Sequence, residues 1–529
     1  MSDLNKVISR QEAVGLVQDG MTLGLLGFVT LSVPEDLLAS LEERFLADGH
    51  PRDLNVFYTS AIGDGGEHGA NHLAHEGLVR RMVGAHVGLA PKLNSLITGD
   101  KIETFCAPQG VLVHMCRALA GHKCGVITHV GLKTYCDPEV EACCFNDAAR
   151  RAHAEGRGIV RSIEVDGRRL LHYKLSPPDV CFIKATYGDS RGNLSMEKEG
   201  LFLEQLEMAM ATKNNGGIVI AQVDTLVEDN TLDPRSVKVH GHFVDYVVVG
   251  RPEYSRQHYF DDTPYHPEWT GEVKVPMAAL EPMELGIRKI IARRGALELR
   301  KNCLVNLGFG MPDGVAAVAG EEGVAGEMTL SIESGTLGGV PAPGNGCGAS
   351  ANVEGIIKHT EIFDGYDGGS IDIAYLGAAQ IDRHGNVNVS KFAGRMTGPG
   401  GFINITQNAK KICFMGTFSS VKNTDIRLED GRLNIVKDSN VVKFVPEVEQ
   451  ITFSGDYARE TGQEVLYITA RAVFRLTEQG LTLVEIAPGV ELEKDIYPLM
   501  GFRPAVSADL KEMDPRIFRP EKMGLVLHD

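Results

Sequence analysis

One carboxylate in the second half of the chain lies where it could act as a nucleophile. Glu333 follows residues 328–332, in which apolar and polar side chains alternate, so the pattern predicts a short strand that ends at the glutamate. The glycines that follow, Gly335, Gly338 and Gly339, would let the backbone bend sharply and a second molecule approach closely. A carboxylate is ionised at neutral pH and attacks without a base. The alternative is a solvated glutamate at a strand end.

A side-chain amide in the first half could stabilise an oxyanion. Gln109 lies between Pro108 and Gly110, immediately before residues 111–120, whose apolar spacing predicts a helix. An amide held in that loop could donate a hydrogen bond to negative charge that develops on a reacting oxygen. The same position suits a glutamine that only caps the helix, and the sequence leaves both interpretations open.

Two glycine-rich turns could bind an anionic group. Gly400 and Gly401 lie within residues 397–405, where consecutive glycines can present two N–H groups to one acceptor; the alternative is a mobile turn. Residues 306–312 predict a strand-to-helix turn that suits a pyrophosphate, although the full G-x-G-x-x-G spacing is absent. The candidate ligand-binding residues of this second turn are Gly308, Phe309, Gly310 and Met311.

Composition limits the class of protein and its partners. The chain has 529 residues, which is too long for one hydrophobic core, and 43% of them are hydrophobic. Its net charge of −17 argues against nucleic acid and membrane partners, but a helix N-terminus could still bind an anionic small ligand. No apolar run is long enough to span a bilayer and no signal peptide is visible. We therefore expect a cytoplasmic protein.

The cysteines and histidines do not have the spacing of a metal site. The ten cysteines form no C-x-x-C pair, so we expect reduced thiols, and Cys143 and Cys144 fit buried structural residues better than a nucleophile. Four histidines gather in the first half without the H-E-x-x-H pattern, so we expect no metal there. These histidines are His68, His72, His75 and His86.

Internal repeats indicate two related α/β domains. Residues 6–16 resemble residues 289–299, and both copies read as a helix that leads to a strand. Residues 179–193 resemble residues 372–386, and each copy reads as a strand followed by a D-x-x-G-N turn and a returning strand. The same order in both halves argues against a chance match.

A proline-rich stretch separates the two halves. Residues 251–285 carry five prolines and little periodicity, so they read as an extended linker. We therefore place the boundary at about residue 275, with an N-terminal domain over residues 1–275 and a C-terminal domain with Glu333 over residues 276–529.

Four separated motifs resemble those of the family I coenzyme A transferases. The sequence Glu-Ser-Gly-x-x-Gly-Gly-x-Pro at residues 333–341 resembles the family's catalytic glutamate motif. The pair Gln109-Gly110, residues 131–138 and residues 398–405 resemble three further motifs in the expected order, so the likeness covers nearly the whole chain. It is greatest to the propionate or acetate CoA-transferases, which carry both halves on one chain.

The resemblance implies a fold, a site and a set of ligands. It implies two domains of the same open α/β fold, like that of NagB and RpiA, with the active site between them. It also implies Glu333 as nucleophile, acyl-CoA and small carboxylic acids as ligands, no permanently bound cofactor and no metal, and a homotetramer or homodimer. Two departures bear on the acyl pocket: residues 24–34 are less glycine-rich than in some relatives, and Cys143-Cys144 replaces glycines.

The implied reaction transfers coenzyme A by a ping-pong mechanism through a glutamyl-CoA thioester. Gln109 and the N–H of Gly401 or Gly400 are the expected oxyanion donors. No ATP is needed, in agreement with the absence of a G-x-x-x-x-G-K-[ST] motif. Two alternatives stay open: an acyl-CoA hydrolase on the same fold, and a non-catalytic sensor of acyl-CoA or a sugar phosphate.

Overall fold

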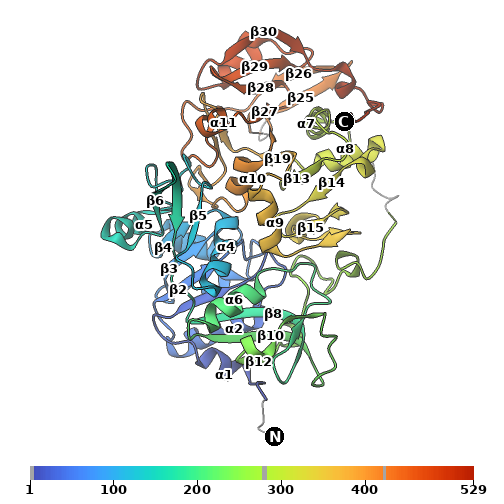
Figure 1. Cartoon of the computed structure of the whole chain (residues 1–529). Helices are drawn as coiled ribbons and strands as arrows, with labels where there is room; N and C mark the ends of the chain where they lie inside the picture. Colours follow the sequence, from blue (N-terminus) through green and yellow to red (C-terminus); the bar gives the residue numbers. More distant parts are fainter. Residues whose placement is uncertain (1–4, 277–282, 421–423) are drawn as a thin grey trace. The chain divides into compact units, whose positions relative to one another are not determined.

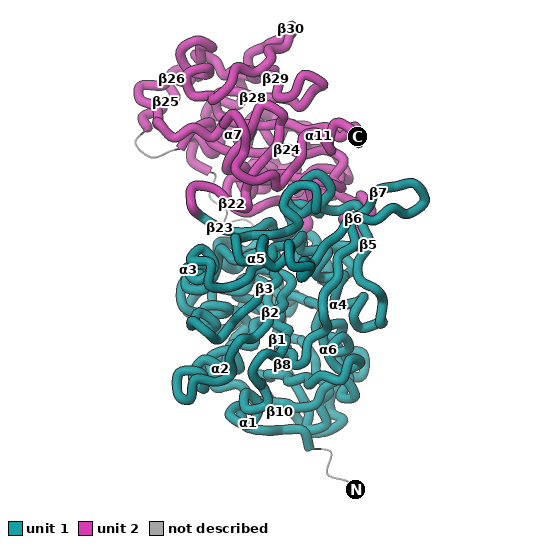
Figure 2. The backbone as a smooth tube through the Cα atoms, turned by 90° about the vertical axis from the view of Figure 1, so that its left-hand side faces the viewer, with its two compact units in different colours: residues 1–275, 332–364, 395–404 teal, residues 276–331, 365–394, 405–529 magenta. Residues whose placement is uncertain are grey.

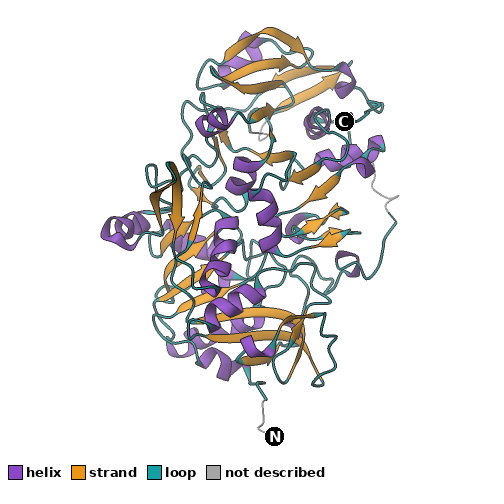
Figure 3. Cartoon of the chain, in the orientation of Figure 1, coloured by secondary structure: helices purple, strands orange, loops and turns teal. Residues whose placement is uncertain are grey.

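The computed structural model describes residues 5–276, 283–420 and 424–529, and these form a mixed α/β chain (Figures 1 and 3). The chain divides into two compact units (Figure 2). Unit 1 contains residues 1–275 together with 332–364 and 395–404, and unit 2 contains residues 276–331, 365–394 and 405–529. Two stretches of the second half, including Glu333, therefore belong to unit 1. The predicted division into domains 1–275 and 276–529 stays a prediction.

Unit 1 is built on a largely parallel sheet. Strand β1 pairs in parallel with β2 and β8, and the parallel order continues from β2 to β3 and β4. Its central strand β8 is buried along nearly its whole length, as expected for a strand covered on both faces. The strands are β1 (Thr22–Leu25), β2 (Leu54–Tyr58), β3 (Val79–Gly84), β4 (Glu103–Cys106), β8 (Val180–Asp189), β9 (Leu194–Ser195), β10 (Ile218–Val227), β11 (Val237–Val239) and β12 (Tyr246–Val249).

Helices and a second, antiparallel sheet complete the first half of unit 1. The helices are α1 (Arg10–Gly15), α2 (Glu35–Asp48), α3 (Pro91–Thr98), α4 (Gln109–Ala120), α5 (Asp147–Ala152) and α6 (Gln205–Lys213). The small sheet contains β5 (Val126–Thr128), β6 (Val160–Val165) and β7 (Arg168–Tyr173). From the second half of the chain, unit 1 includes the short strands β15 (Thr336–Leu337), β16 (Val340–Pro341), β17 (Ser350–Ala351) and β18 (Gly355–Ile356).

Unit 2 has a mixed sheet, whose antiparallel strands β28 and β29 are followed by β30, parallel to β29. Strands β14, β13, β19, β24 and β27 pair in parallel, and β28 and β29 continue the sheet in antiparallel order. The strands are β13 (Leu304–Leu307), β14 (Thr329–Ser331), β19 (Ile373–Gly377), β24 (Lys411–Met415), β27 (Glu464–Ile468), β28 (Ala472–Thr477), β29 (Gly480–Ile486) and β30 (Ala505–Glu512). The helices are α7 (Ile287–Ala296), α8 (Gly314–Glu322) and α11 (Gly455–Thr461), while α9 (His359–Asp367) and α10 (Phe402–Asn408) each begin in unit 1. The predicted α/β class is confirmed.

The repeated sequences have the same hydrogen bonds. In unit 1 the carboxylate of Asp179 accepts from the N–H of Thr22 at 2.7 Å, where β1 begins. In unit 2 the carboxylate of Asp372 accepts from the N–H of Leu304 at 2.8 Å, where β13 begins. A conserved geometry of this kind in both copies supports the interpretation of these stretches as one repeated supersecondary unit.

The described part of the predicted linker is folded instead of extended. Residues 251–276 contain two 3-10 turns, each begun by a proline, and Trp269 at the end of the second is only 3% exposed. Its indole stacks on His266 with ring centroids 4.2 Å apart and packs with Phe28 and Leu201. The prolines therefore fix turns in a packed segment. The rest of the linker prediction falls partly on residues 277–282, which lie outside the described residues. No helix within the described ranges has the length and apolar character to cross a bilayer.

Candidate active site

Glu333 lies in a tight turn that has no room for a side chain at position 335. Strand β14 ends at Ser331, slightly earlier than predicted, and Gly335 donates to the carbonyl of Ile332 at 3.0 Å to close the turn. Gly335 has a φ of +107°, and a Cβ built there would lie 2.2 Å from the carbonyl oxygen of Ile357. Because only glycine fits both the backbone angle and the contact, this residue fixes the turn that presents Glu333.

The environment of Glu333 combines access with poor solvation. The residue is partly exposed, so a ligand can reach it. Desolvation by the surrounding protein raises the pKa of Glu333 above its ordinary value, against the smaller opposing effects of its own backbone N–H and of His359. A carboxylate that is weakly hydrated loses little solvation when it attacks an electrophile.

A fully buried string of polar side chains holds Gln109. This residue is the first of α4 and is 2% exposed, and its amide nitrogen lies 3.0 Å from Nε2 of His359. His359 Nδ1 lies 2.7 Å from the carboxylate of Glu204, whose other oxygen accepts from the hydroxyl of Thr59. Pro108 occupies the N-cap position of α4, and the side chain of Gln109 bonds to His359 instead of to the helix backbone. The capping alternative is therefore wrong, and the amide is held by a histidine.

These residues gather at the carboxyl ends of the parallel strands of unit 1. Thr59 follows β2, Ala85 follows β3 and Gln109 follows β4. In open parallel sheets this edge is where ligands bind, because the loops there are free to carry functional groups. The sheet therefore places the buried string at the edge where a ligand site is expected.

The turn around Gly400 distinguishes the two expected backbone donors. The N–H of Gln109 donates to the carbonyl of Gly400 at 3.0 Å, which fixes the turn beside the amide. The N–H of Gly400 is used, because it donates to the carbonyl of Ala85 at 3.0 Å. Among the described residues the N–H of Gly401 has no protein acceptor, and it directly precedes helix α10. Of the two glycines, Gly401 therefore has its N–H available for a ligand, and its role as an oxyanion donor stays a prediction.

Replacement of Gly110 by alanine should impair both folding and turnover. Its N–H donates to the side chain of Asn404 at 3.0 Å, and a Cβ there would lie 2.4 Å from the Asn404 amide nitrogen and 2.5 Å from Phe363. The overlap must be relieved by a shift of the backbone at the start of α4, which carries both the new methyl group and Gln109. We expect a lower melting temperature and at least a ~10-fold lower kcat, because small displacements of reacting groups are costly. Gly121→Ala, where the nearest atom is 3.6 Å away, is the matched control.

The other predicted ligand-binding residues lie in turns of both units, and their binding role stays a prediction. Gly338 and Gly339 have φ of +71° and +75°, and a Cβ at either would overlap Glu354 or the carbonyl of Ala351. Their conformation is therefore explained by the packing of the strands they join. Gly308, Phe309, Gly310 and Met311 form the predicted turn between β13 and α8 in unit 2, where Phe309 is 67% exposed.

Comparison with known proteins identifies the family. Residues 7–250 match the model of the family described as coenzyme A transferase. Caffeate CoA-transferase from Acetobacterium woodii is 43% identical over 98% of both chains. The chain belongs to the coenzyme A transferase family.

Further relatives agree with this assignment over the full length. Acetate CoA-transferase YdiF from Escherichia coli (strain K12) is 40% identical over 98% of this chain and 96% of its own. The crystal structure of the acyl-CoA transferase YdiF apoenzyme from E. coli O157:H7 has a TM-score of 0.93 and 39% identity, over 100% of this chain and 99% of that one. A YdiF structure described as a thioester complex with CoA has a TM-score of 0.92 and 39% identity, over 99% and 98%. This chain is therefore a CoA-transferase, and coenzyme A is its substrate.

The sequence pointed only to Gln109, and not to the other three members of the buried string in this CoA-transferase: Thr59, Glu204 and His359. His359 lies 250 positions from Gln109 and 155 positions from Glu204 along the chain. No motif links residues at such distances, and a single histidine or glutamate carries no local spacing that would single it out. Only burial of both side chains, each 0% exposed, marks them as unusual.

Cys143 and Cys144 are buried in this CoA-transferase, in agreement with the structural interpretation. Their exposed fractions are 0% and 2%. Desolvation raises the pKa of Cys144 to about 11 and that of Cys143 well above its ordinary value. Both therefore stay protonated at neutral pH, which is unfavourable for a nucleophile.

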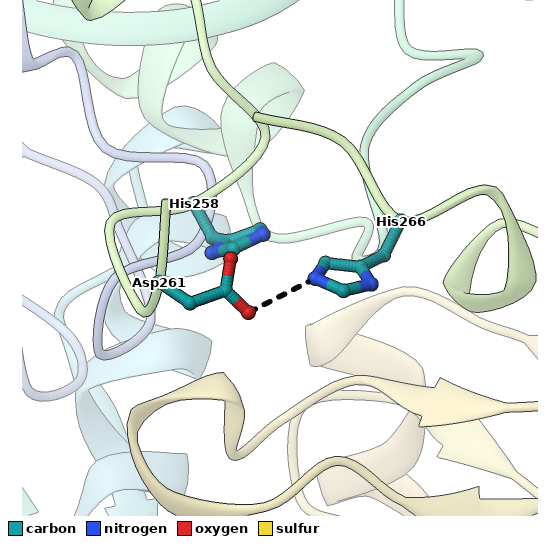
Figure 4. A group of neighbouring side chains, drawn as sticks. All are labelled: His258, Asp261 and His266. Carbon is teal, nitrogen blue, oxygen red and sulfur yellow. Dashed lines mark hydrogen bonds and ion pairs between the residues drawn. The ribbon is translucent and has the colours of Figure 1, made fainter. Parts of the chain in front are cut away.

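One group within the described ranges has the composition of a metal site. His258, Asp261 and His266 bring possible ligand atoms within 4.8 Å of one another, and His266 Nε2 lies 3.2 Å from the Asp261 carboxylate (Figure 4). However, His258 Nδ1 accepts from the N–H of Phe260 at 3.0 Å, and burial lowers the pKa of His258 to about 4. The neutral ring then carries its proton on Nε2, where a metal ligand needs a lone pair. The turn is thus hydrogen-bonded through Nδ1 of His258, while Nε2 of that ring is buried without a hydrogen-bond partner.

Proposed function

We propose that this CoA-transferase moves coenzyme A between a short-chain acyl-CoA and a free carboxylic acid through a glutamyl-CoA thioester on Glu333. The observation that carries the proposal is the carboxylate itself, partly exposed yet poorly solvated, on a turn that only glycine can form. The name of one relative, acetate CoA-transferase, and the thioester complex described for another support the substrate class and the intermediate.

The reaction conserves the thioester energy in two exchanges. A carboxylate oxygen of Glu333 attacks the carbonyl carbon of the acyl-CoA, and the C–S bond breaks to give a mixed anhydride and CoA thiolate. The thiolate then attacks the glutamyl carbonyl carbon, and the first acid leaves as a carboxylate. A second carboxylate attacks the glutamyl-CoA, and the same two steps run in reverse. No proton is gained or lost overall.

Two donors would stabilise the oxyanion of each tetrahedral intermediate. The amide N–H of Gln109 and the backbone N–H of Gly401 are the candidates, since Gly400 already donates to Ala85. Donors that are held in place before the reaction cost no reorganisation when the charge develops. Water must be kept from the glutamyl-CoA, or the enzyme would act as a hydrolase.

Kinetics with two substrates test the proposed function. We expect consumption of acetyl-CoA to require an added acid, to yield free acetate and the CoA thioester of that acid, and to give parallel double-reciprocal lines, as a covalent intermediate demands. The acceptor acids should range from propionate and butyrate to caffeate, because one relative is a caffeate CoA-transferase. CoA release at an undiminished rate without any acid would instead establish a hydrolase.

Glu333→Gln should be as stable as the wild type at neutral pH, or more so. Because desolvation raises the pKa of Glu333 in the folded state, the folded protein favours the neutral form. The ionised side chain therefore reduces stability as pH rises from the unfolded pKa, ~4.3, through the folded pKa. We expect the melting temperature of Glu333→Gln to equal or exceed that of the wild type at pH 7.5, with the difference shrinking towards pH 4.5. A clearly lower melting temperature at pH 7.5 would contradict a poorly solvated carboxylate.

A further inference from the structure

A buried histidine stands behind the predicted oxyanion donor. Thr59, Glu204, His359 and Gln109 form one continuous string in which each side chain contacts the next, and all four are at most 2% exposed. We propose that His359 is a positioning residue that, with Glu204 behind it, fixes the amide of Gln109 with its nitrogen in the donor orientation. This inference rests on the proposed role of Gln109 in oxyanion stabilisation.

The contacts with Glu204 and Gln109 determine which ring nitrogen of His359 carries a proton. Glu204 receives the Thr59 hydroxyl at one oxygen and His359 Nδ1 at the other, at 2.7 Å, so Nδ1 carries a proton. The atom of Gln109 that lies 3.0 Å from Nε2 is the amide nitrogen, which can only donate, so Nε2 accepts this hydrogen bond. The orientation of the amide is therefore dictated by the tautomer of His359, and the tautomer by Glu204.

This arrangement leaves one N–H of Gln109 available. An amide nitrogen has two N–H groups that diverge in the plane of the amide, so the one bonded to His359 fixes the direction of the other. Without His359 the amide could turn over and present its oxygen to the developing charge, which would repel the oxyanion. A fixed amide avoids that state and needs no reorganisation during the reaction.

Two aromatic rings hold the ring of His359, and a hydrogen bond holds its backbone. Phe28 packs against it edge-on with ring centroids 5.9 Å apart, and Phe363 lies at 5.4 Å. The backbone N–H of His359 donates to the carbonyl of Phe202 at 2.8 Å. The same segment reaches the nucleophile, because Ile357, two residues earlier, donates to Gly335 in the Glu333 turn at 2.9 Å. These contacts hold His359 in place independently of Gln109, as a residue that positions Gln109 requires.

Two substitutions separate positioning from folding. In His359→Gln the amide oxygen reaches the place of Nε2, so it can still accept from Gln109, but the contact with Glu204 is lost. In His359→Asn the shorter amide can still donate to Glu204, but nothing reaches Gln109. We expect kcat to fall by less than about 5-fold in His359→Gln and by ~10²-fold in His359→Asn, the usual effect of losing one oxyanion donor. KM for acetyl-CoA should change by less than ~3-fold in both.

The melting temperatures should follow the opposite order. His359→Gln leaves the buried carboxylate of Glu204 without its main partner, so it should be the less stable variant. A residue that only supports the fold would lose activity in the same order as stability. A positioning role is therefore indicated if His359→Gln has the higher kcat but the lower melting temperature of the two variants.

A double-mutant cycle completes the test and does not depend on His359→Gln folding. Gln109→Ala and the double variant Gln109→Ala/His359→Asn should have the same kcat within ~3-fold, because His359 acts only through Gln109. Additive losses, or wild-type kcat in His359→Asn, would overturn the inference. Loading of wild-type Glu333 with CoA, measured by mass spectrometry in the same preparations, separates this outcome from failure of the proposed function itself.

Discussion

Glu333→Ala should lose transferase activity to background. Removal of a catalytic nucleophile costs of order 10⁶ in rate in well-studied hydrolases, and no second carboxylate is presented by the same glycine turn. Incubation of the wild type with acetyl-CoA and no acceptor should add one CoA per chain, and hydroxylamine should release it. Glu333→Ala should show no such adduct in the mass spectrum of the intact chain.

Glu333→Asp should also be nearly inactive, for a geometric reason. Its carboxylate falls short by one methylene, roughly 1.5 Å. The backbone cannot follow, because Gly335 is locked against the carbonyl of Ile357. Displacements of this size near a reacting atom cost ~10²-fold or more. Glu327→Ala, at an exposed glutamate that ends the 3-10 turn before β14, is the matched control and should load and turn over normally. Sequential kinetics with no CoA on the peptide that contains Glu333 would refute the proposed mechanism.

Gln109→Ala should lower kcat by ~10²–10³-fold with little change in KM, because the donor acts on charge that exists only in the transition state. The variant should also lose some stability, of order 1–3 kcal/mol, since His359 Nε2 is left buried without its partner. Steady-state kinetics and thermal melts measure the two effects.

The control for Gln109→Ala is Gln222, a glutamine that is also buried but has no role in the proposed mechanism. Gln222 accepts from the N–H of Asp36 at 3.0 Å and donates to the carbonyl of Tyr254 at 3.2 Å. Gln222→Ala should reduce the melting temperature similarly while kcat stays near that of the wild type. Equal kcat in Gln109→Ala and Gln222→Ala would remove Gln109 from the mechanism.

The parts of the site that local sequence encodes could be predicted. An alternating strand pattern followed by glycines indicated Glu333, and a helix start after a proline indicated Gln109. Both signals concern neighbours in the chain, where strand periodicity, helix boundaries and glycine turns are set. The α/β class followed in the same way, from repeated local patterns.

The rest depends on contacts between distant residues. His359 and Glu204 become recognisable only once the fold buries them beside Gln109. The choice between Gly400 and Gly401 depends on a hydrogen bond to Ala85, at the end of another strand. Residues 251–276 read as a linker because prolines dominate the local pattern, whereas the decisive interaction is the burial of Trp269 against residues far away in sequence.

The interleaved make-up of unit 1 has a consequence for fragments of the chain. A cut between Val275 and Met283 would leave Gln109 and Glu204 on one fragment, and Glu333 and His359 on the other. Neither fragment would then contain all of the proposed active-site residues, so each fragment alone should have no transferase activity. If the fragments reassociate, His359 must again contact Gln109 and Glu204, which then belong to a different polypeptide. Co-expressed halves would thus form a split enzyme whose recovered turnover reports reassembly of unit 1.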